Sequence, residues 1–196
     1  IKRYYNRDCD VVFPPCDIEK YVNNPRNPQD YYLFFGQLVG YKRADLAIEA
    51  CIQSKRKIVV IGEGKSKQAK KYQKSGYVTF TGRVSDEQVA DYLSKAKALL
   101  FPGIEDFGII PVEANSAGCP VLAYKKGGAI DSIKENITGL FFEEQTVQSI
   151  IDCINKFESM ESQFTNREAY TAHVQQFSKN QFIQKMSHLI EEKRHL

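Results

Sequence analysis

The sequence predicts an α/β fold built on a doubly wound parallel sheet. Short apolar runs, which are typical of buried parallel strands, alternate along the 196 residues with segments whose apolar residues recur at helical spacing. The repeating unit spans about 20–30 residues, as expected for a strand followed by a helix. Because sheets of this kind bind ligands beyond the carboxyl ends of their strands, the loops that follow the strands are the candidate functional segments.

Six segments are expected to form the strands. Each is short, rich in Val, Ile, Leu, Phe or Tyr, and bounded by polar residues, glycine or proline. They are residues 11–13, 32–35, 58–61, 78–80, 98–101 and 121–124.

Four helices are supported by apolar residues spaced three or four positions apart. Capping boxes, in which a serine precedes a glutamine by three positions, mark the starts of two of them at Ser85-x-x-Gln88 and Ser178-x-x-Gln181. The shared apolar faces are Ala44, Ala47, Ile48 and Cys51; Val89, Tyr92, Leu93 and Ala96; Val147, Ile150, Ile151 and Ile154; and, expected to face inward in a terminal helix, Phe182, Ile183, Met186, Leu189 and Ile190.

The chain divides into three parts. Residues 1–10 are rich in Tyr, Asn, Arg and Asp and have too little apolar surface to fold alone, so they are expected to be a linker from a preceding domain. Residues 10–177 hold the strand and helix units. Residues 178–196 hold the terminal helix.

The composition is that of a soluble globular protein, with 42% hydrophobic and 26% charged residues. A net charge of +3 with scattered lysines does not favour nucleic acid as a partner. Five cysteines without Cys-x-x-Cys spacing favour reduced, structural thiols and a cytoplasmic location. No apolar run approaches the ~18 residues that a transmembrane helix needs.

The most informative motif runs from Glu105 to Glu113 and follows the expected strand at 98–101. Gly108 lets the backbone approach a ligand, and Pro111 suits the first turn of a helix, whose free N–H groups favour phosphate or sugar oxygens. A carboxylate in that first helical turn would repel a phosphate, so Glu113 better matches the two hydroxyls of a ribose. Taken alone, Glu113 is also explained as an acid that stabilises a helix start, and Glu105 as a solvated acid in a loop.

Further loops place cations and glycines at the same edge. Lys42 and Arg43 lie at an expected helix start, where positive charge is unfavourable unless an anion binds; a solvated pair partly neutralised by Asp45 is the alternative. Gly62-Glu-Gly64-Lys65 and Gly127-Gly128 follow two other strands. Gly64-Lys65-Ser66 is not a phosphate-binding Walker A loop, because the glycine required five positions before Gly64 is Val59.

These motifs together resemble the donor-binding, C-terminal half of family 4 retaining glycosyltransferases, which have the GT-B fold. The resemblance spans about residues 10–192. It is carried, in order, by Phe35-Gly36-x-Leu-Val-x-x-Lys42, Val60-Ile-Gly-Glu-Gly64, Val78-Thr-Phe-Thr-Gly82, Glu105-Asp-Phe-Gly-Ile-Ile-Pro-Val-Glu113, Ala117-Gly-Cys-Pro-Val121, and Gly127-Gly128 with Asn136-x-x-Gly139. It implies a Rossmann-like domain that binds a nucleotide sugar.

The resemblance implies a role for each candidate residue. Glu105 would contact the donor hexose, Glu113 the ribose and Lys42 the diphosphate, with Glu105 and Lys42 the catalytic pair. Backbone groups of Phe107, Gly108, Ile109 and Ile110 would bind the hexose and diphosphate, Val78 and Phe80 would lie near the base with Arg83 as a weaker candidate, and Gly36, Gln37, Gly62 and Gly64 would complete the donor site. Gln37 stands where many members have arginine, and Arg43 is the candidate replacement.

The implied reaction is retaining hexosyl transfer to a glycan or lipid-linked acceptor. The acceptor would bind a preceding N-terminal domain, which could also bring the enzyme to a membrane, and this chain alone would be inactive. The segment Tyr41-Lys42-Arg43-Ala-Asp45 resembles polysaccharide-assembly mannosyltransferases and favours GDP-mannose, with UDP-glucose or UDP-N-acetylglucosamine as the alternative donor.

Two other classes of function stay open. A non-catalytic nucleotide-sugar-binding module would share the same loops, and an epimerase or phosphorylase of the same fold would need catalytic groups that no segment supplies convincingly. The implied transfer needs no metal or other cofactor, and His173, His188 and His195 are expected to be solvated.

Overall fold

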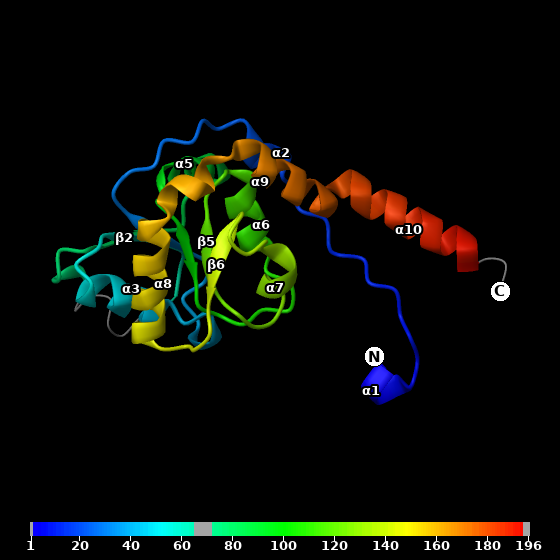
Figure 1. The fold of residues 1–196 in the computed structure, drawn as a ribbon, viewed down its shortest axis with the longest axis horizontal. Coiled ribbons are helices and arrows are strands. Elements are labelled where there is room, and N and C mark those ends of the chain that lie inside the picture. Colours follow the sequence, from blue (N-terminus) through cyan, green and yellow to red (C-terminus); the bar gives the residue numbers. More distant parts are fainter. Residues whose placement is uncertain (1, 65–71, 194–196) are drawn as a thin grey trace.

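The computed structural model describes residues 2–64 and 72–193 and has the predicted α/β architecture (Figure 1). Six parallel strands form one sheet in the order β3-β2-β1-β4-β5-β6. The strands are β1 (Tyr32–Phe35), β2 (Ile58–Ile61), β3 (Val78–Gly82), β4 (Leu99–Phe101), β5 (Val121–Tyr124) and β6 (Gly139–Phe142). The chain direction across the sheet reverses between β1 and β4, so their carboxyl ends define the topological switch point.

Helices and short 3-10 turns connect the strands. The α-helices are α1 (Lys2–Tyr5), α2 (Glu19–Val22), α3 (Ala44–Gln53), α5 (Asp86–Lys95), α6 (Ile109–Ser116), α7 (Ala129–Ser132), α8 (Val147–Ser159), α9 (Arg167–Val174) and α10 (Lys179–Lys193). The 3-10 turns are η1 (Gly40–Lys42), η2 (Glu161–Thr165) and η3 (Gln175–Phe177).

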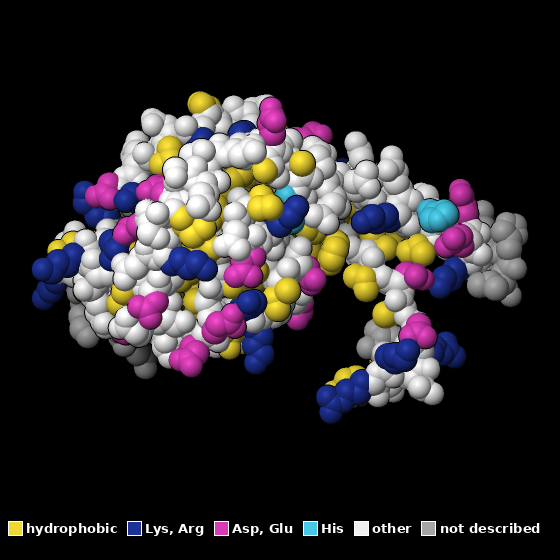
Figure 2. Space-filling view, in the orientation of Figure 1, with side chains coloured by type: hydrophobic (Ala, Val, Ile, Leu, Met, Phe, Trp, Pro, Cys, Tyr) yellow, Lys and Arg dark blue, Asp and Glu magenta, His cyan; other side chains and the backbone are white. Residues whose placement is uncertain are grey.

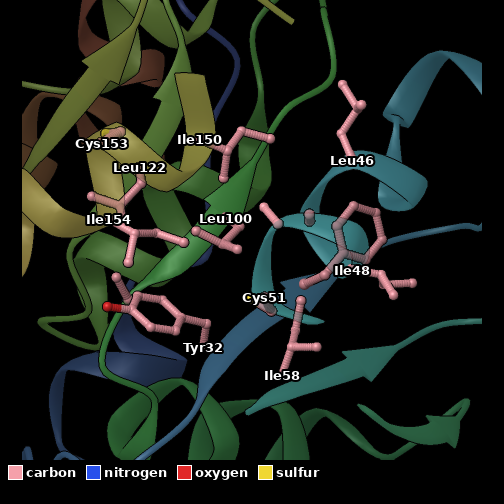
Figure 3. Close-up of a cluster of buried hydrophobic side chains, with 14 of the residues drawn as sticks. Tyr32, Leu46, Ile48, Cys51, Ile58, Leu100, Leu122, Ile150, Cys153 and Ile154 are labelled. Atoms are coloured by element: carbon pink, nitrogen blue, oxygen red, sulfur yellow. The ribbon is translucent and has the colours of Figure 1, made fainter. Parts of the chain in front are cut away.

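In every strand of the sheet but β3, alternate residues face two separate cores, as a sheet covered on both faces requires. On one face, α3 and α8 pack over the side chains of Tyr32 and Phe34 in β1 (Figure 3). On the other face, α5 and α6 pack over Leu33 of the same strand. Burying both faces leaves the strand ends and their loops as the exposed edges of the sheet.

Of the two predicted capping boxes, the one at α5 has both of its hydrogen bonds, and the one at α10 has the bond to the serine side chain. At α5, Ser85 Oγ accepts from the backbone N–H of Gln88 (3.3 Å), and Gln88 Oε1 accepts from the backbone N–H of Ser85 (3.0 Å), which completes the capping box. At α10, Ser178 Oγ accepts from the backbone N–H of Gln181 (3.3 Å).

Two strand assignments differ from the prediction. Residues 11–13 are not a strand: Val11 is exposed, and the prolines Pro14 and Pro15 that follow have no N–H to donate to a sheet. Conversely, Gly139–Phe142 is the edge strand β6, which pairs along its length with β5. The sheet therefore has six strands, as predicted. The predicted strand at residues 11–13 is absent, and β6, the last strand in the sequence, takes its place in the count.

The terminal helix forms as predicted, but its apolar face is not buried. Ile183, Met186 and Ile190 are 51%, 36% and 54% exposed, and none of the residues of α10 is fully buried. The helix extends away from the sheet, and its hydrophobic side chains are visible along its length (Figures 1 and 2). An amphipathic pattern predicts a helix with an apolar face, but it does not predict that residues of the same chain cover that face.

Candidate functional site

A cavity of about 560 Å³ lies at the carboxyl ends of the strands, where the sheet order reverses. Loops after β1, β2 and β3 and the first turn of α6 surround it. Its lining residues are Phe35, Gly36, Gln37, Val39, Lys42, Ile61, Gly62, Glu63, Gly64, Arg83, Val84, Asp86, Val89 and Ile110. The structure therefore brings together Gly36, Gln37, Lys42, Gly62, Gly64, Arg83 and Ile110 from the predicted set.

Two glycines allow the loops to pack closely around this cavity. Gly62 has φ +138°, and a Cβ there would overlap the backbone carbonyl of Gly36. Gly103, which the sequence did not single out, would place a Cβ 2.9 Å from Cα of Lys42. The loop after β4 can thus lie directly against η1, and this contact positions Lys42.

Lys42 and Glu105 form an ion pair beside the cavity. Nζ of Lys42 donates to Oε1 of Glu105 at 2.8 Å, and the two side chains are 14% and 20% exposed. A mostly buried charge pair gains more from its mutual attraction than a surface pair, but both groups have lost hydration. An anionic ligand on Lys42 and ligand hydroxyls on Glu105 can replace that lost hydration, so the pair is suited to a ligand that carries both groups.

Arg43 takes a different position from Lys42. It is the left-handed N-cap of α3 (φ +51°), and its Nε lies 3.2 Å from Oδ1 of Asp45. Arg43 does not line the cavity. The pairing with Asp45 is the alternative that the sequence left open for this side chain.

The amino end of α6 faces the same edge. Gly108 is its N-cap with φ +81°, Ile109 and Ile110 are its first residues, and Pro111 lies in its first turn as predicted. The first N–H groups of a helix have no partner within the helix and favour an anion or hydroxyl.

Glu113 lies in the second turn of α6 and not in the first turn, as the sequence suggested. The helix begins at Ile109, so Glu113 is its fifth residue, and the first turn holds no acidic residue. The carboxylate is therefore set back from the helix start, which lessens its repulsion of a phosphate bound there.

Tyr21 of α2 holds the Glu113 side chain. Its hydroxyl donates to Oε1 of Glu113 at 3.0 Å, across 92 residues of sequence. Burial raises the pKa of Glu113, while the hydrogen bond from Tyr21 opposes this shift. Burial and the nearby Glu113 also raise the pKa of the Cys16 thiol to about 11. No sequence pattern predicted this position for Tyr21, because α2 is a single short turn between irregular segments.

Several predicted residues lie away from the cavity lining. Val78 and Phe80 are in β3 with their side chains at the core between the sheet and α3, and Val78 is at the amino end of its strand. Phe107 stacks on Phe13 at 5.4 Å between ring centres, so its side chain points into a small aromatic cluster with Phe177. Only the main chain of Phe107 is left for a ligand.

Other residues line the cavity without having been predicted. Glu63, Val84, Asp86 and Val89 follow β2 and β3, and a base or ribose near Arg83 would meet them. Val84 and Val89 lie two and seven positions after β3 and belong to no distinctive motif, so sequence reasoning had no basis for choosing them.

Lys65, the last residue of the predicted loop Gly62-Glu-Gly64-Lys65, lies outside the described residues.

Four of the cysteines are buried and Cys9 is exposed, and all five are free thiols. His173 is partly buried rather than solvated: its Nε2 lies 3.0 Å from the carbonyl of Ser132, and burial lowers its pKa.

One Asp-x-Asp spacing occurs, at Asp8-Cys9-Asp10 in the exposed N-terminal segment. There Asp8 pairs with Lys2 and Asp10 with Lys193. Among residues 2–64 and 72–193, no helix is long and apolar enough to cross a lipid bilayer.

Comparison with known proteins assigns the family. Residues 17–195 match the model of the family glycosyl transferases group 1. These residues make up far more than half of the chain. The chain belongs to this family. The match spans every strand of the sheet and all of the loops around the cavity described above.

Curated relatives match shorter parts. The human alpha-1,3/1,6-mannosyltransferase ALG2 is 39% identical over 82 residues, which are 41% of this chain and 20% of that protein. A GDP-mannose-dependent alpha-(1-6)-phosphatidylinositol monomannoside mannosyltransferase of Mycobacterium tuberculosis is 31% identical over 86 residues (40% of this chain, 22% of that protein). The D-inositol 3-phosphate glycosyltransferase of Streptomyces scabiei is 28% identical over 177 residues (72% of this chain, 39% of that protein).

Solved structures share the fold. The Anabaena protein Alr3699/HepE, in complex with UDP and glucose, is 19% identical with a TM-score of 0.76, over 93% of this chain and 56% of that one. Sucrose-phosphate synthase from Thermosynechococcus elongatus is 22% identical with a TM-score of 0.73, over 95% of this chain and 52% of that one. The chain thus spans about half of these structures and has the fold of the C-terminal half of GT-B glycosyltransferases.

Proposed function

We propose that this chain is the donor-binding half of a retaining glycosyltransferase that transfers a hexose from a nucleotide sugar to a glycan or lipid-linked acceptor. The observation that carries the proposal is the Lys42–Glu105 pair beside a cavity at the switch point of the sheet. A nucleotide sugar offers both of the groups that this pair can bind, a diphosphate for the ammonium and sugar hydroxyls for the carboxylate.

Each candidate residue then has a distinct task. Lys42 and the free N–H groups at the start of α6 stabilise the negative charge that develops on the departing nucleoside diphosphate. Glu105 orients the hexose by accepting from its hydroxyls, and Glu113, held by Tyr21, accepts from the ribose diol. An oxygen of the leaving diphosphate is the candidate base for the acceptor hydroxyl.

GDP-mannose is the proposed donor. The support is the segment Tyr41-Lys42-Arg43-Ala-Asp45, together with the two partial relatives whose names state mannosyl transfer. A purine also offers more surface than a pyrimidine to the apolar side chains Val84 and Val89 of the cavity. UDP-glucose is the second candidate, because HepE, which has the same fold, was solved with UDP and glucose.

A thermal-shift comparison of GDP, UDP and ADP, each with and without its sugar, tests the donor. The proposal predicts the largest shift with GDP-mannose and a smaller one with GDP. A larger shift with UDP than with GDP would refute the mannosyl assignment but keep the glycosyltransferase one. No shift with any nucleotide would refute donor binding itself.

A further inference from the structure

A second cavity, of about 250 Å³, lies at the opposite edge of the sheet. Lys97 and Pro120 line it, two residues before β4 and one residue before β5, so this is the edge where the strands begin. The end of α8, the turn η2 and the start of α9 close the other side. The full lining is Arg26, Pro28, Lys97, Gly118, Pro120, Phe157, Glu161, Phe164, Thr165, Arg167 and Tyr170.

Two guanidinium groups meet at this cavity without a counter-ion. Arg26 donates to the backbone carbonyls of Leu93, Ser94 and Lys97, at 3.1, 2.9 and 2.9 Å. Arg167 donates to the carbonyl of Val22 at 2.8 Å. Within the described part of the chain, no carboxylate lies within 4.0 Å of either group.

The carbonyls that Arg26 contacts lie at the carboxyl end of α5, whose partial negative charge balances part of its positive charge, but no carboxylate among the described residues completes that balance. Burial, and the charge of Arg26 close by, lower the pKa of Arg167. Glu161 is the one acidic side chain among the lining residues, and it forms no ion pair with either arginine. Lys97 adds a third positive charge, although Asp30 at 3.5 Å and Glu158 at 4.0 Å partly balance it. Two like charges held together in this way favour a bound anion.

Two polar groups of the lining residues have no hydrogen-bond partner among residues 2–64 and 72–193. Nη1 of Arg167 and the hydroxyl of Tyr170 are both shielded from solvent, and Tyr170 is only 1% exposed. An unpaired buried donor costs about 1–3 kcal/mol, so native proteins rarely keep one without a function or a bound molecule. Both groups can donate to an oxygen, and they come from adjacent turns of α9.

We infer that this cavity binds a small oxyanion, a phosphate or a carboxylate, through Arg26, Arg167 and Tyr170. The apolar walls formed by Phe157, Phe164, Pro28 and Pro120 strengthen the attraction by excluding water. An arginine pair also matches the geometry of such an anion, since each guanidinium offers parallel N–H donors. The site is independent of the proposed donor site, which lies beyond the other ends of the strands.

Calorimetric titration with inorganic phosphate and, separately, with acetate tests this inference. Wild-type protein is expected to bind at least one of the two saturably. Because a hydrogen bond to a charged group contributes about 1.5–3 kcal/mol, Arg167→Gln should weaken binding by roughly tenfold or more. Tyr170→Phe, which keeps the ring and the packing, should weaken it by about fivefold. Lys185→Ala, at an exposed lysine of α10 that lines neither cavity, should change it by less than about twofold.

Three results would overturn the inference. One is that neither anion binds saturably to the wild type. Another is that Lys42→Ala abolishes binding while Tyr170→Phe leaves it intact, which would assign the anion to the donor site. The third is a crystal structure, grown with the tighter anion, in which only water occupies the cavity. If Arg167→Gln does not fold, Tyr170→Phe still decides the question.

Discussion

Removing one hydroxyl, with Tyr21→Phe, tests whether Tyr21 positions Glu113. The ring of Tyr21 is 3% exposed and packs in the core beneath α5 and α6, and phenylalanine keeps that packing. The only interaction lost is the 3.0 Å hydrogen bond from the Tyr21 hydroxyl to Oε1 of Glu113. Because phenylalanine keeps the shape of the ring and removes one hydrogen-bond donor, a change in stability or affinity can be assigned to that hydrogen bond.

The expected magnitude follows from the charge of the acceptor. Glu113 is largely buried, and a hydrogen bond to such a carboxylate contributes about 1.5–3 kcal/mol to the free energy of unfolding. The loss should be largest at pH values above the raised pKa of Glu113, where the carboxylate is ionised, and should shrink as the pH falls through that pKa. A protonated carboxyl accepts only a neutral hydrogen bond, which contributes about 0.5–1.5 kcal/mol.

Urea denaturation of the wild type and Tyr21→Phe between pH 4 and 8 measures this dependence. Calorimetry with a ribonucleotide and its 2′-deoxy form measures the effect on the site. We expect Tyr21→Phe to weaken the ribonucleotide more than the deoxy form, because a carboxylate that is no longer held binds the ribose diol less well. Tyr72→Phe is the matched control, since its hydroxyl donates to Oε1 of Glu49 at 3.0 Å and lies away from the cavity lining.

Tyr72→Phe should leave both nucleotide affinities unchanged. The positioning role of Tyr21 would be refuted if Tyr21→Phe weakened the two nucleotides equally, or if its stability loss were the same at every pH.

Three further substitutions test other parts of the site. Glu113→Gln should weaken ribonucleotides more than 2′-deoxy forms by calorimetry. Burial raises the pKa of Glu113, so the wild type loses stability as the pH rises through that raised pKa. The stability of Glu113→Gln relative to the wild type, measured in urea, should therefore increase from acidic to neutral pH. Glu105→Gln should weaken the sugar nucleotide more than the bare diphosphate, and identical ligand profiles for the two glutamine variants would contradict their separate roles. Gly62→Ala should lower the free energy of unfolding by roughly 2 kcal/mol or more, whereas Gly40→Ala, which has open space at its Cβ, should cost less than about 1 kcal/mol; equal losses would argue against the close approach of the loops.

Local pattern predicted most of the sheet because buried parallel strands are short apolar runs between polar segments. Residues 32–35, 58–61 and 121–124 are strands with the predicted bounds. The same pattern misled at residues 11–13, where an apolar run is followed by two prolines and has no neighbouring strand to pair with. Apolar character alone does not supply a pairing partner.

The sequence predicted the parts of the candidate site that consist of glycine turns and of side chains in the loops directly after strands. Gly36, Lys42 and Gly62 follow β1 and β2, and the strand order brings their loops together at one cavity. Contacts between distant segments could not be predicted in this way. Tyr21 reaches Glu113, and Lys42 reaches Glu105, only through the tertiary fold.

The terminal helix shows a second limit. Its sequence indicates an amphipathic helix, but the partner for Ile183, Met186 and Ile190 cannot be inferred from the spacing of apolar residues. A pattern of this kind predicts which side of the helix is apolar, but it does not predict which residues cover that side.

The binding of a nucleoside diphosphate through Lys42 is the central claim, and calorimetry of Lys42→Ala tests it most directly. Wild type and variant are each titrated with GDP and with guanosine, and Lys57→Ala, an exposed lysine at the other edge of the sheet, is the control for the change in net charge. We predict that Lys42→Ala weakens GDP by roughly tenfold or more, since it removes a charge-assisted contact, while guanosine changes by less than about twofold. Equal losses for GDP and guanosine would contradict the assignment of Lys42 to the diphosphate.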